Sequence, residues 1–210
     1  LYFVLIYVCA DAVWNMGGMK AVFDNIKVDN IYDDGVPTNT NTYKTYLKNI
    51  KTKNIPFHIP KAGEMIALFD GVDFHVAGPV SEITDQKGRP DLNNNSIVGK
   101  LTYGDFSMLF TGDAEKEEES AILKSGFGLK CDVLKVGHHG SRTGTTPSFL
   151  KAVAPKEAFI SCGQGNDYGH PHKETMTKLE NAGIHIFRTD RDGTVTLTTD
   201  GSTYQIAKEH

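Results

Sequence analysis

Five side chains that could bind a metal ion follow three apolar segments of this sequence. Asp113 comes after MLFTG, His138 and His139 come after LKVG, and His170 and His172 come after ISCGQGNDYG. Neutral imidazole and carboxylate groups suit Zn²⁺ or Mn²⁺, and one carboxylate can bridge two such ions. Two ions about 3.5–4 Å apart would hold a hydroxide and stabilise the negative charge of a hydrolytic transition state. These residue types therefore predict hydrolysis at a metal centre.

The recurrence of these side chains after strands favours one shared site. Taken alone, Asp113 is typical of a turn or a helix cap, and a histidine pair is typical of a hydrogen-bonded loop. In layered α/β proteins, however, sites form where loops leave the ends of neighbouring strands. Four histidines and one aspartate after three strands therefore predict a metal or catalytic site at one edge of a sheet.

A polar loop follows the two adjacent histidines. Its hydroxyl and guanidinium groups belong to Ser141, Arg142, Thr143, Thr145 and Thr146. These groups could donate hydrogen bonds to the anionic oxygens of a substrate. The same residues are equally compatible with a solvated loop that ends in an N-cap for the next helix.

The elements that must position these residues alternate between helical and extended patterns, which predicts a layered α/β fold. The predicted helices cover residues 17–26, 40–54, 114–126, 146–155 and 173–183. The predicted strands lie within residues 1–10, 27–35, 56–60, 65–70, 72–78, 131–137, 157–163 and 185–190. Two hairpins are predicted, one over 95–113 with its turn at 103–105 and one over 194–208 with its turn at Asp200-Gly201.

The composition is that of an ordinary globular chain. Its 210 residues are 39% hydrophobic, which is enough for one α/β domain with its own core. The net charge of −4 gives no overall attraction to nucleic acid, so any such contact must come from a local cluster of Lys and Arg. Cys9, Cys131 and Cys162 lack Cys-x-x-Cys spacing and are predicted to be buried thiols.

The opening segment LYFVLIYVCA is the most apolar part of the chain. Its ten residues are half of the roughly 20 needed to span a bilayer, and it lacks the basic flank of a signal peptide. An interior strand is therefore expected rather than a trimmed targeting segment. Because the chain starts at Leu1, its true N-terminus is expected to lie upstream.

Three longer motifs resemble the metallo-β-lactamase superfamily, and specifically the domain found in ComEC-type DNA-uptake proteins. They are NNNSIVGKLTYGDFSMLFTGD, LKVGHHGSRTGTTPSFLKAVAPKEAFISCG and NDYGHPHKETMTKLENAGIHIFRTDRDGTV. Their order and spacing agree with that family from about Gly17 to Val195. The resemblance implies an αββα sandwich, apparently lacking its first strands, with a di-metal hydrolytic site at one edge. Residues 1–210 would then be a single domain that is incomplete at its N-terminus.

Carried onto this sequence, the resemblance assigns roles to the matching residues. Asp113 matches the carboxylate of the TGD motif that can bridge two metals, and the HHGS and GHPH motifs fall on residues 138–141 and 169–172. The implied catalytic residues are Asp113, His138, His139 and His170, the implied metal ligands are Asp113, His139 and His170, and the implied substrate-binding residues are Ser141, Arg142 and His172. The expected cofactor is Zn²⁺ or Mn²⁺, with two ions if the first ligand motif of the family is intact.

That first motif departs from the family pattern. The family carries His-x-His-x-Asp-His just before a Gly-Gly pair, whereas this chain has Ala10, Ala12, Trp14 and Asn15 in that region. Three explanations are open: the domain has lost its metals, residues outside this sequence complete the site, or the residues recorded at positions 9–15 are unreliable. The abrupt change to close agreement at Gly17 favours the third explanation.

Three functions follow from these observations. The first is metal-dependent hydrolysis of a phosphodiester, with nucleic acid as the substrate class that the resemblance implies. The second is a metal-free binding or scaffold module, and the third is hydrolysis of another ester, such as a choline-phosphate ester or a lactone. The resemblance also implies a membrane-associated or extracytoplasmic setting.

Basic residues near the predicted site could supply phosphate contacts despite the negative net charge. They are Lys135, Arg142, Lys173, Arg188 and Arg191. Ordinary surface charges are the alternative interpretation.

Overall fold

The computed structural model describes residues 18–210. The predicted strand at 1–10, Cys9 and the first-motif positions 9–15 lie outside the described residues. Among those that are described, every predicted helix and strand is present within a few residues of its expected bounds. The hydrophobic periodicity of the sequence therefore predicted the order of the elements correctly.

The described elements comprise helices, 3-10 turns and strands. The helices are α2 (Met19–Asn25), α3 (Asn41–Thr52), α4 (Lys116–Ser125), α5 (Pro147–Val153), α6 (Lys173–Asn181) and α7 (Thr189–Asp192), with 3-10 turns at Asn93–Asn95 and Gly137–Gly140. The strands are β1 (Ile31–Tyr32), β2 (Phe57–His58), β3 (Met65–Phe69), β4 (Val72–Gly78), β5 (Val98–Tyr103), β6 (Phe106–Phe110), β7 (Val133–Lys135), β8 (Glu157–Ile160), β9 (His185–Arg188), β10 (Val195–Thr199) and β11 (Tyr204–Lys208).

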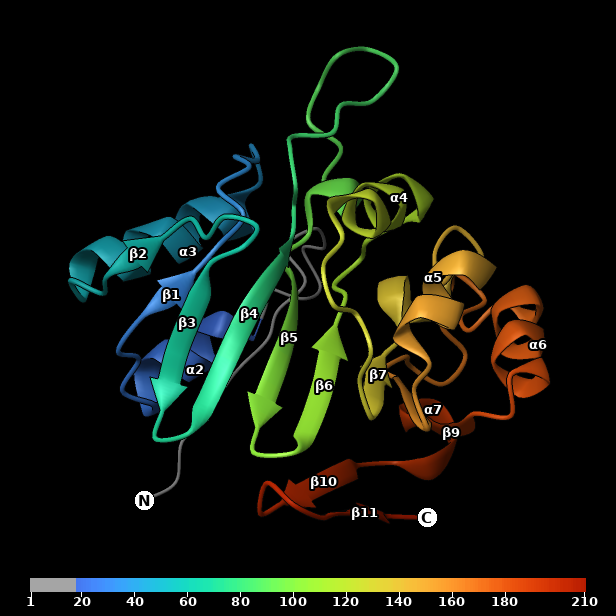
Figure 1. Cartoon of the computed structure of the whole chain (residues 1–210). Coiled ribbons are helices and arrows are strands. Elements are labelled where there is room, and N and C mark those ends of the chain that lie inside the picture. The colour runs from blue at the N-terminus through green and yellow to red at the C-terminus, as the bar shows by residue number, and fades with distance from the viewer. Residues whose placement is uncertain (1–17) are drawn as a thin grey trace.

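A seven-stranded sheet in the order β3-β4-β5-β6-β7-β8-β9 forms the centre of the described structure (Figure 1). Strands β3 to β6 pair antiparallel, whereas β6 to β9 pair parallel. In the parallel half all strands run the same way, so the loops that leave β6, β7 and β8 start at the same edge. This topology is what brings the predicted site residues together.

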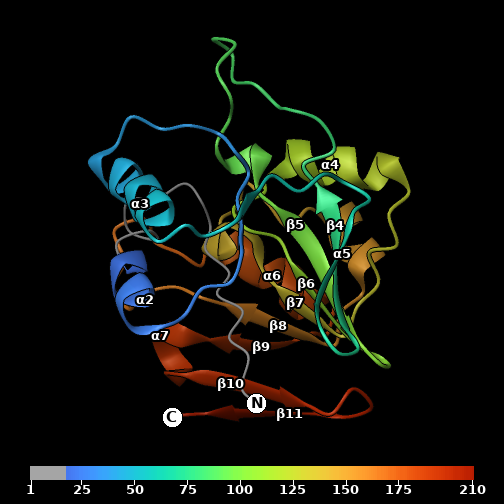
Figure 2. The same cartoon turned by 90° about the vertical axis from the view of Figure 1, so that its left-hand side faces the viewer.

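Helices cover both sides of this sheet. Figure 2 shows α2 and α3 on one side and α4 and α5 on the other. The main core joins β6, β7 and β8 to α4, α5 and α6, and its fully buried side chains include Leu109, Ile122, Leu134, Phe149 and Leu179. A smaller cluster joins α2, α3 and β1 around Phe23, Tyr43 and Tyr46. Within residues 18–210, no helix has the length and apolar character needed to cross a membrane.

Two helix ends follow from local sequence. Thr146 precedes α5 and its hydroxyl accepts a hydrogen bond from the backbone N–H of Phe149, while Pro147 occupies the first turn, where no backbone donor is needed. Helix α4 ends at Gly126, whose φ of 77° lies in the left-handed region that glycine adopts without a steric penalty.

Two details differ from the sequence-based expectations. Cys131 is buried as predicted, but the prediction for Cys162 is wrong, because this thiol is only half-buried and donates to Asp190 at the start of α7. The short helix α7 was not predicted, because four residues give no measurable periodicity.

A buried aspartate joins the final hairpin to the sheet. The Asp192 carboxylate accepts hydrogen bonds from the backbone N–H of Arg188 and from the side chains of Arg191 and Lys208. Its backbone carbonyl accepts from the N–H groups of Glu209 and His210. The hydrogen bonds from Arg191, followed by the one from Arg188, hold the pKa of this carboxyl well below its ordinary range.

We expect Asp192→Asn to destabilise the protein in a pH-dependent way. A depressed pKa in the folded state means that the ionised carboxylate contributes stability above the unfolded pKa of about 3.9, and that this contribution is lost as the pH falls below it. The substitution should lower the free energy of unfolding by roughly 1–3 kcal/mol at pH 7 and by less at pH 3. Urea unfolding at the two pH values measures both effects. The exposed Asp105→Asn is the control, and an equal loss at both pH values would contradict the assignment.

Candidate metal and catalytic site

Backbone and side-chain hydrogen bonds connect the loops that leave β6, β7 and β8. The Thr111 hydroxyl donates to the carbonyl of Lys135 over 2.7 Å, and the N–H of His138 donates to the carbonyl of Gly112 over 2.9 Å. The N–H of His172 donates to the carbonyl of Gly140 over 3.0 Å. The three loops therefore form one hydrogen-bonded rim.

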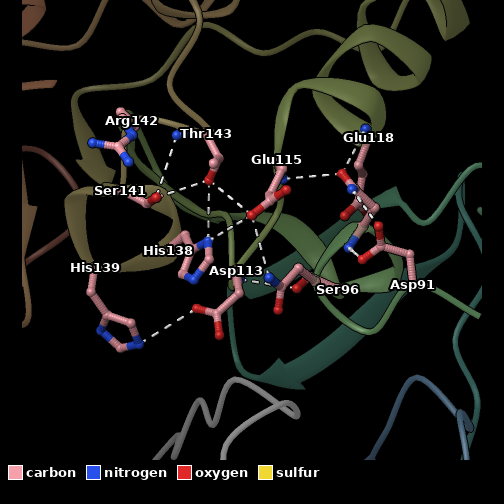
Figure 3. Close-up of polar contacts among 12 residues, drawn as sticks. Asp91, Ser96, Asp113, Glu115, Glu118, His138, His139, Ser141, Arg142 and Thr143 are labelled. Atoms are coloured by element: carbon pink, nitrogen blue, oxygen red, sulfur yellow. Dashed lines mark hydrogen bonds and ion pairs between the residues drawn. The ribbon is translucent and has the colours of Figure 1, made fainter. Parts of the chain in front are cut away.

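The structure brings together the five side chains that the sequence singled out. The His170 ring lies 5.5 Å from that of His138, 6.4 Å from that of His139 and 4.8 Å from that of His172, measured between ring centroids. Asp113 Oδ1 lies 3.5 Å from His139 Nε2 (Figure 3). The metal-ligand roles stay predictions, because residues 18–210 contain no group of three or more His, Cys, Asp or Glu side chains whose geometry could already hold an ion.

The two adjacent histidines lie on strained backbone. His138 has φ 46° and ψ 45°, and His139 has φ 54° and ψ 24°, both in the left-handed region. Each such residue costs roughly 1–3 kcal/mol and persists only where the surroundings fix it. The following Gly140 is required for a related reason: its φ is 84°, and a Cβ there would approach Pro171 Cβ to 2.6 Å. This backbone turns both imidazoles into the rim.

Hydrogen bonds select the tautomer of three of the histidines. His139 Nδ1 lies 2.7 Å from the carbonyl of Ser161 and must donate to it, so Nε2 of the neutral ring is an acceptor. His138 Nδ1 lies 3.0 Å from Glu115 Oε1, so Nδ1 again carries the proton. His172 is reversed, because its Nδ1 accepts from the backbone N–H of Arg142 over 3.1 Å, and its Nε2 is therefore the donor. In the neutral rings Nε2 of His139 and of His138 is therefore an acceptor, whereas Nε2 of His172 is a hydrogen-bond donor.

The surroundings keep His170 neutral. Burial, followed by the neighbouring His138, His172 and His139, lowers the pKa of His170 from 6.5 to about 4. An imidazole must be unprotonated to bind a metal ion, and near neutral pH this ring is unprotonated.

The chemical types of these side chains suit a divalent cation. Asp113 is buried, and its Oδ1 has no hydrogen-bond donor among the described residues. His139 Nε2 lies 3.5 Å from this oxygen and is itself an acceptor when the ring is neutral. Two acceptors facing each other in a buried site are unfavourable unless a proton or a cation lies between them. The combination of carboxylate and imidazole is one that Zn²⁺ and Mn²⁺ prefer.

A set of asparagine and serine contacts positions the segment that carries Asp113, and sequence reasoning did not assign these roles. Ser96 Oγ accepts from the backbone N–H of Asp113 over 3.0 Å. Asn94 Oδ1 accepts from the N–H groups of Glu115 and Glu118 at the start of α4, each over 3.2 Å. The motif NNNS was the available signal, because a run of polar residues next to an apolar strand is expected to satisfy nearby backbone groups.

The loop after the histidines is held by Glu119. Its two carboxylate oxygens accept from the backbone N–H groups of Thr145 over 2.5 Å and of Thr146 over 2.8 Å. Thr145 has φ 51°, so these contacts also fix a strained residue. Burial of Glu119 raises its pKa, in opposition to these hydrogen bonds. The geometry of Thr145 and Thr146 is therefore explained by their place in a loop that ends in the N-cap of α5, which is the second of the two interpretations of the sequence.

The predicted substrate-binding residues differ in accessibility. Arg142 and Thr143 are exposed, whereas Ser141 is only 3% exposed and its hydroxyl lies 2.9 Å from Thr143 Oγ1. Thr143 in turn donates to Glu115 over 2.8 Å. The predicted role of Ser141 in substrate binding stays a prediction, and its hydroxyl takes part in the network that orients His138.

The predicted basic cluster divides into two groups. The charges of Arg188 and Arg191 are paired with Asp190 and Asp192, and Lys135 donates to the neighbouring carbonyl of Val136. Arg142 and Lys173 are both exposed. The backbone N–H of Arg142 donates to Nδ1 of His172, and Lys173 follows His172 in the sequence. Of the five predicted basic residues, these two adjoin His172.

Comparison with known proteins defines the class. The family model of the metallo-beta-lactamase superfamily matches residues 25–164, so the chain belongs to that superfamily. Its fold class is therefore the α/β fold of the metallo-β-lactamase type, as expected.

Three curated relatives place the chain among ComEC-like domains, which confirms the resemblance seen in the sequence. ComE operon protein 3 of Bacillus subtilis is 36% identical over 71% of this chain and 18% of its own length. Competence protein ComA of Neisseria gonorrhoeae is 38% identical over 60% of this chain and 18% of its own length. Recombination protein 2 of Haemophilus influenzae is 39% identical over 53% of this chain and 13% of its own length. The chain thus matches less than a fifth of the length of each relative.

We expect Glu119→Gln to loosen the loop after the histidines. An amide offers only one acceptor oxygen and leaves a buried backbone N–H without a partner, which should lower the free energy of unfolding by roughly 1–3 kcal/mol. Urea unfolding measures the loss. Glu117→Gln, an exposed change on the same helix, is the matched control and should cost less than about 0.5 kcal/mol. Equal effects of the two changes would rule out the proposed role of Glu119.

Proposed function

We propose that this chain is a metal-dependent hydrolase of phosphodiester bonds in nucleic acid. The observation that carries the proposal is the buried oxygen of Asp113, which lacks a donor among the described residues and lies 3.5 Å from Nε2 of His139. Membership of the metallo-β-lactamase superfamily supports hydrolysis as the reaction class. The names of the relatives refer to competence and recombination, which supports nucleic acid as the substrate.

In this proposal the residues divide into ligands, orienting groups and substrate contacts. Asp113, His139 and His170 would hold Zn²⁺ or Mn²⁺, with a second ion if the first ligand motif is intact. When bound, such an ion lowers the pKa of a water molecule and stabilises charge on phosphate oxygens. Glu115 fixes the ring of His138, which is suited to orient substrate or to move a proton.

Three groups on one side of the cluster suit an anionic substrate. His172 presents Nε2 as a donor because its Nδ1 is an acceptor for Arg142 N–H. The Arg142 guanidinium and the Lys173 ammonium add exposed positive charge beside it. Arg and Lys side chains are the usual partners of phosphate oxygens.

A second candidate function is a metal-free binding or scaffold module. The residues Ala10, Ala12, Trp14 and Asn15 favour it, since they cannot replace the family's histidine ligands. Intact-protein mass spectrometry of the natural protein separates the two candidates, because histidines at these positions would remove the reason for the second.

We expect Asp113→Asn to abolish metal-dependent cleavage. The natural protein, purified without chelator, should contain Zn²⁺ or Mn²⁺ by elemental analysis and should cleave a model phosphodiester. Loss of a shared carboxylate should reduce both metal affinity and cleavage rate by at least about 100-fold. Asp105→Asn on the β5–β6 turn is the control and should change neither. Absence of both metal and cleavage in the natural protein would overturn the proposal.

We expect Arg142→Ala and Lys173→Ala each to weaken nucleic-acid binding by removing a phosphate contact, and therefore to make the affinity less dependent on salt concentration. Each lost phosphate contact should reduce the slope of log affinity against log salt concentration by about 1. Fluorescence anisotropy over a range of salt concentrations measures this slope. Lys124→Ala, an exposed change at the far end of α4, should leave the slope unchanged. An unchanged slope in the two site variants would count against these contacts.

A further inference from the structure

Tyr168 is an exposed aromatic ring at the edge of the histidine cluster. This residue is 68% exposed, which is the highest value among the large hydrophobic residues within 18–210. Its ring lies 5.6 Å from that of His170 with an angle of 22° between the planes. One face of the tyrosine is therefore covered by a site residue, while most of the side chain is open to solvent.

The stacking continues into the site. The His170 ring is in turn nearly parallel to that of His139, at 16° and 6.4 Å. His139 faces the Asp113 carboxylate. Tyr168, His170 and His139 thus form a row of rings that begins in solvent and ends at the group proposed to bind the metal. A planar group stacked on the outer face of Tyr168 would extend this row.

The loop that carries Tyr168 is held in place by its own hydrogen bonds. Asn166 donates from Nδ2 to the carbonyls of Gly163 and His170, and its Oδ1 accepts from the N–H of His170 over 2.9 Å. The N–H of Gly169 donates to the carbonyl of Asn166 over 3.2 Å. These contacts close the segment that contains Tyr168, so the ring is presented at a fixed place beside His170.

We propose that Tyr168 is a specificity-determining residue that stacks on an unpaired base of the nucleic-acid strand next to the bond that is cleaved. This inference rests on the proposed function and refines it, because the bases of a duplex already stack on each other and only a single-stranded or unpaired base can cover the ring. Arg142 and Lys173 would contact the phosphates of the same strand. Stacking tolerates any base, so no sequence preference is expected.

Binding of fluorescein-labelled oligothymidylate tests this inference by anisotropy. The second probe is an abasic strand of the same length, and the third is a duplex. The wild-type chain should bind the thymine-bearing strand roughly ten-fold or more tightly than the abasic strand, and more tightly than the duplex. Tyr168→Leu should remove the preference for thymine over the abasic strand, and Tyr168→Phe should retain it.

Tyr32→Leu is the matched control. Tyr32 is also exposed and its ring also stacks on a histidine, His58, but it lies on β1, away from β7 (Figure 1). This change should leave all three affinities within two-fold of wild type. Circular dichroism confirms that each variant is folded.

The possible outcomes distinguish failure of the proposed Tyr168 role from failure of the proposed nucleic-acid hydrolysis. Equal binding of thymine-bearing and abasic strands by the wild type, or an unchanged preference in Tyr168→Leu, would overturn the role of Tyr168 while leaving nucleic-acid hydrolysis intact. Failure of the wild type to bind or cleave any of the three probes would overturn the nucleic-acid function and the inference with it.

Discussion

The arrangement of this site depends on the parallel pairing of β6, β7 and β8. Because the three strands run in one direction, their carboxyl ends meet at one edge and deliver Asp113, His138 to His139, and His170 to His172 to one rim. Short hydrogen bonds between the loops, such as the one from His138 N–H to the Gly112 carbonyl, then fix the distances. The burial of Leu109, Leu134 and Ile160 holds the strands in register, so the hydrophobic core and the polar rim are two consequences of the same sheet.

This arrangement is unfavourable in isolation and depends on support from outside the rim. His138 and His139 hold strained backbone, and the surroundings of His170 disfavour its charged form. The compensating contacts come from α4 and the segment before β5: Asn94 satisfies the first turn of the helix, and Glu119 satisfies the loop on the other side. Glu118 lies behind them, fully buried, and burial raises the pKa of its carboxyl well above the ordinary range, which favours the neutral acid there. Helix α4 therefore stabilises the loops of the rim as well as packing in the core.

The sequence was sufficient to predict the described elements except α7, and it identified the side chains that meet at the rim, because both follow from patterns that repeat at short range. Hydrophobic periodicity defines a helix or strand, and a polar residue after each strand marks the shared edge. Contacts across long separations were not predictable in this way. Glu119 binds the backbone of Thr145, 26 positions away, and nothing in either local sequence specifies that pair. Likewise, the tautomers of His139 and His172 depend on the carbonyl of Ser161 and the N–H of Arg142, which become neighbours only in the folded chain.

The chemistry of Asp113 bears on the choice between a hydrolase and a metal-free module. A buried carboxylate oxygen without a donor, 3.5 Å from an imidazole nitrogen, lowers stability unless a proton or a cation joins the two groups. An asparagine at this position could donate to His139 Nε2 and would remove the conflict without a change in shape. A domain that serves only as a scaffold gains nothing from this carboxylate, from strained backbone at two histidines, or from a ring at position 170 that is kept neutral. Such locally unfavourable features are typical of sites at which function opposes stability. These features, on residues 113, 138, 139 and 170, are consistent with the proposed hydrolase and do not depend on the first motif.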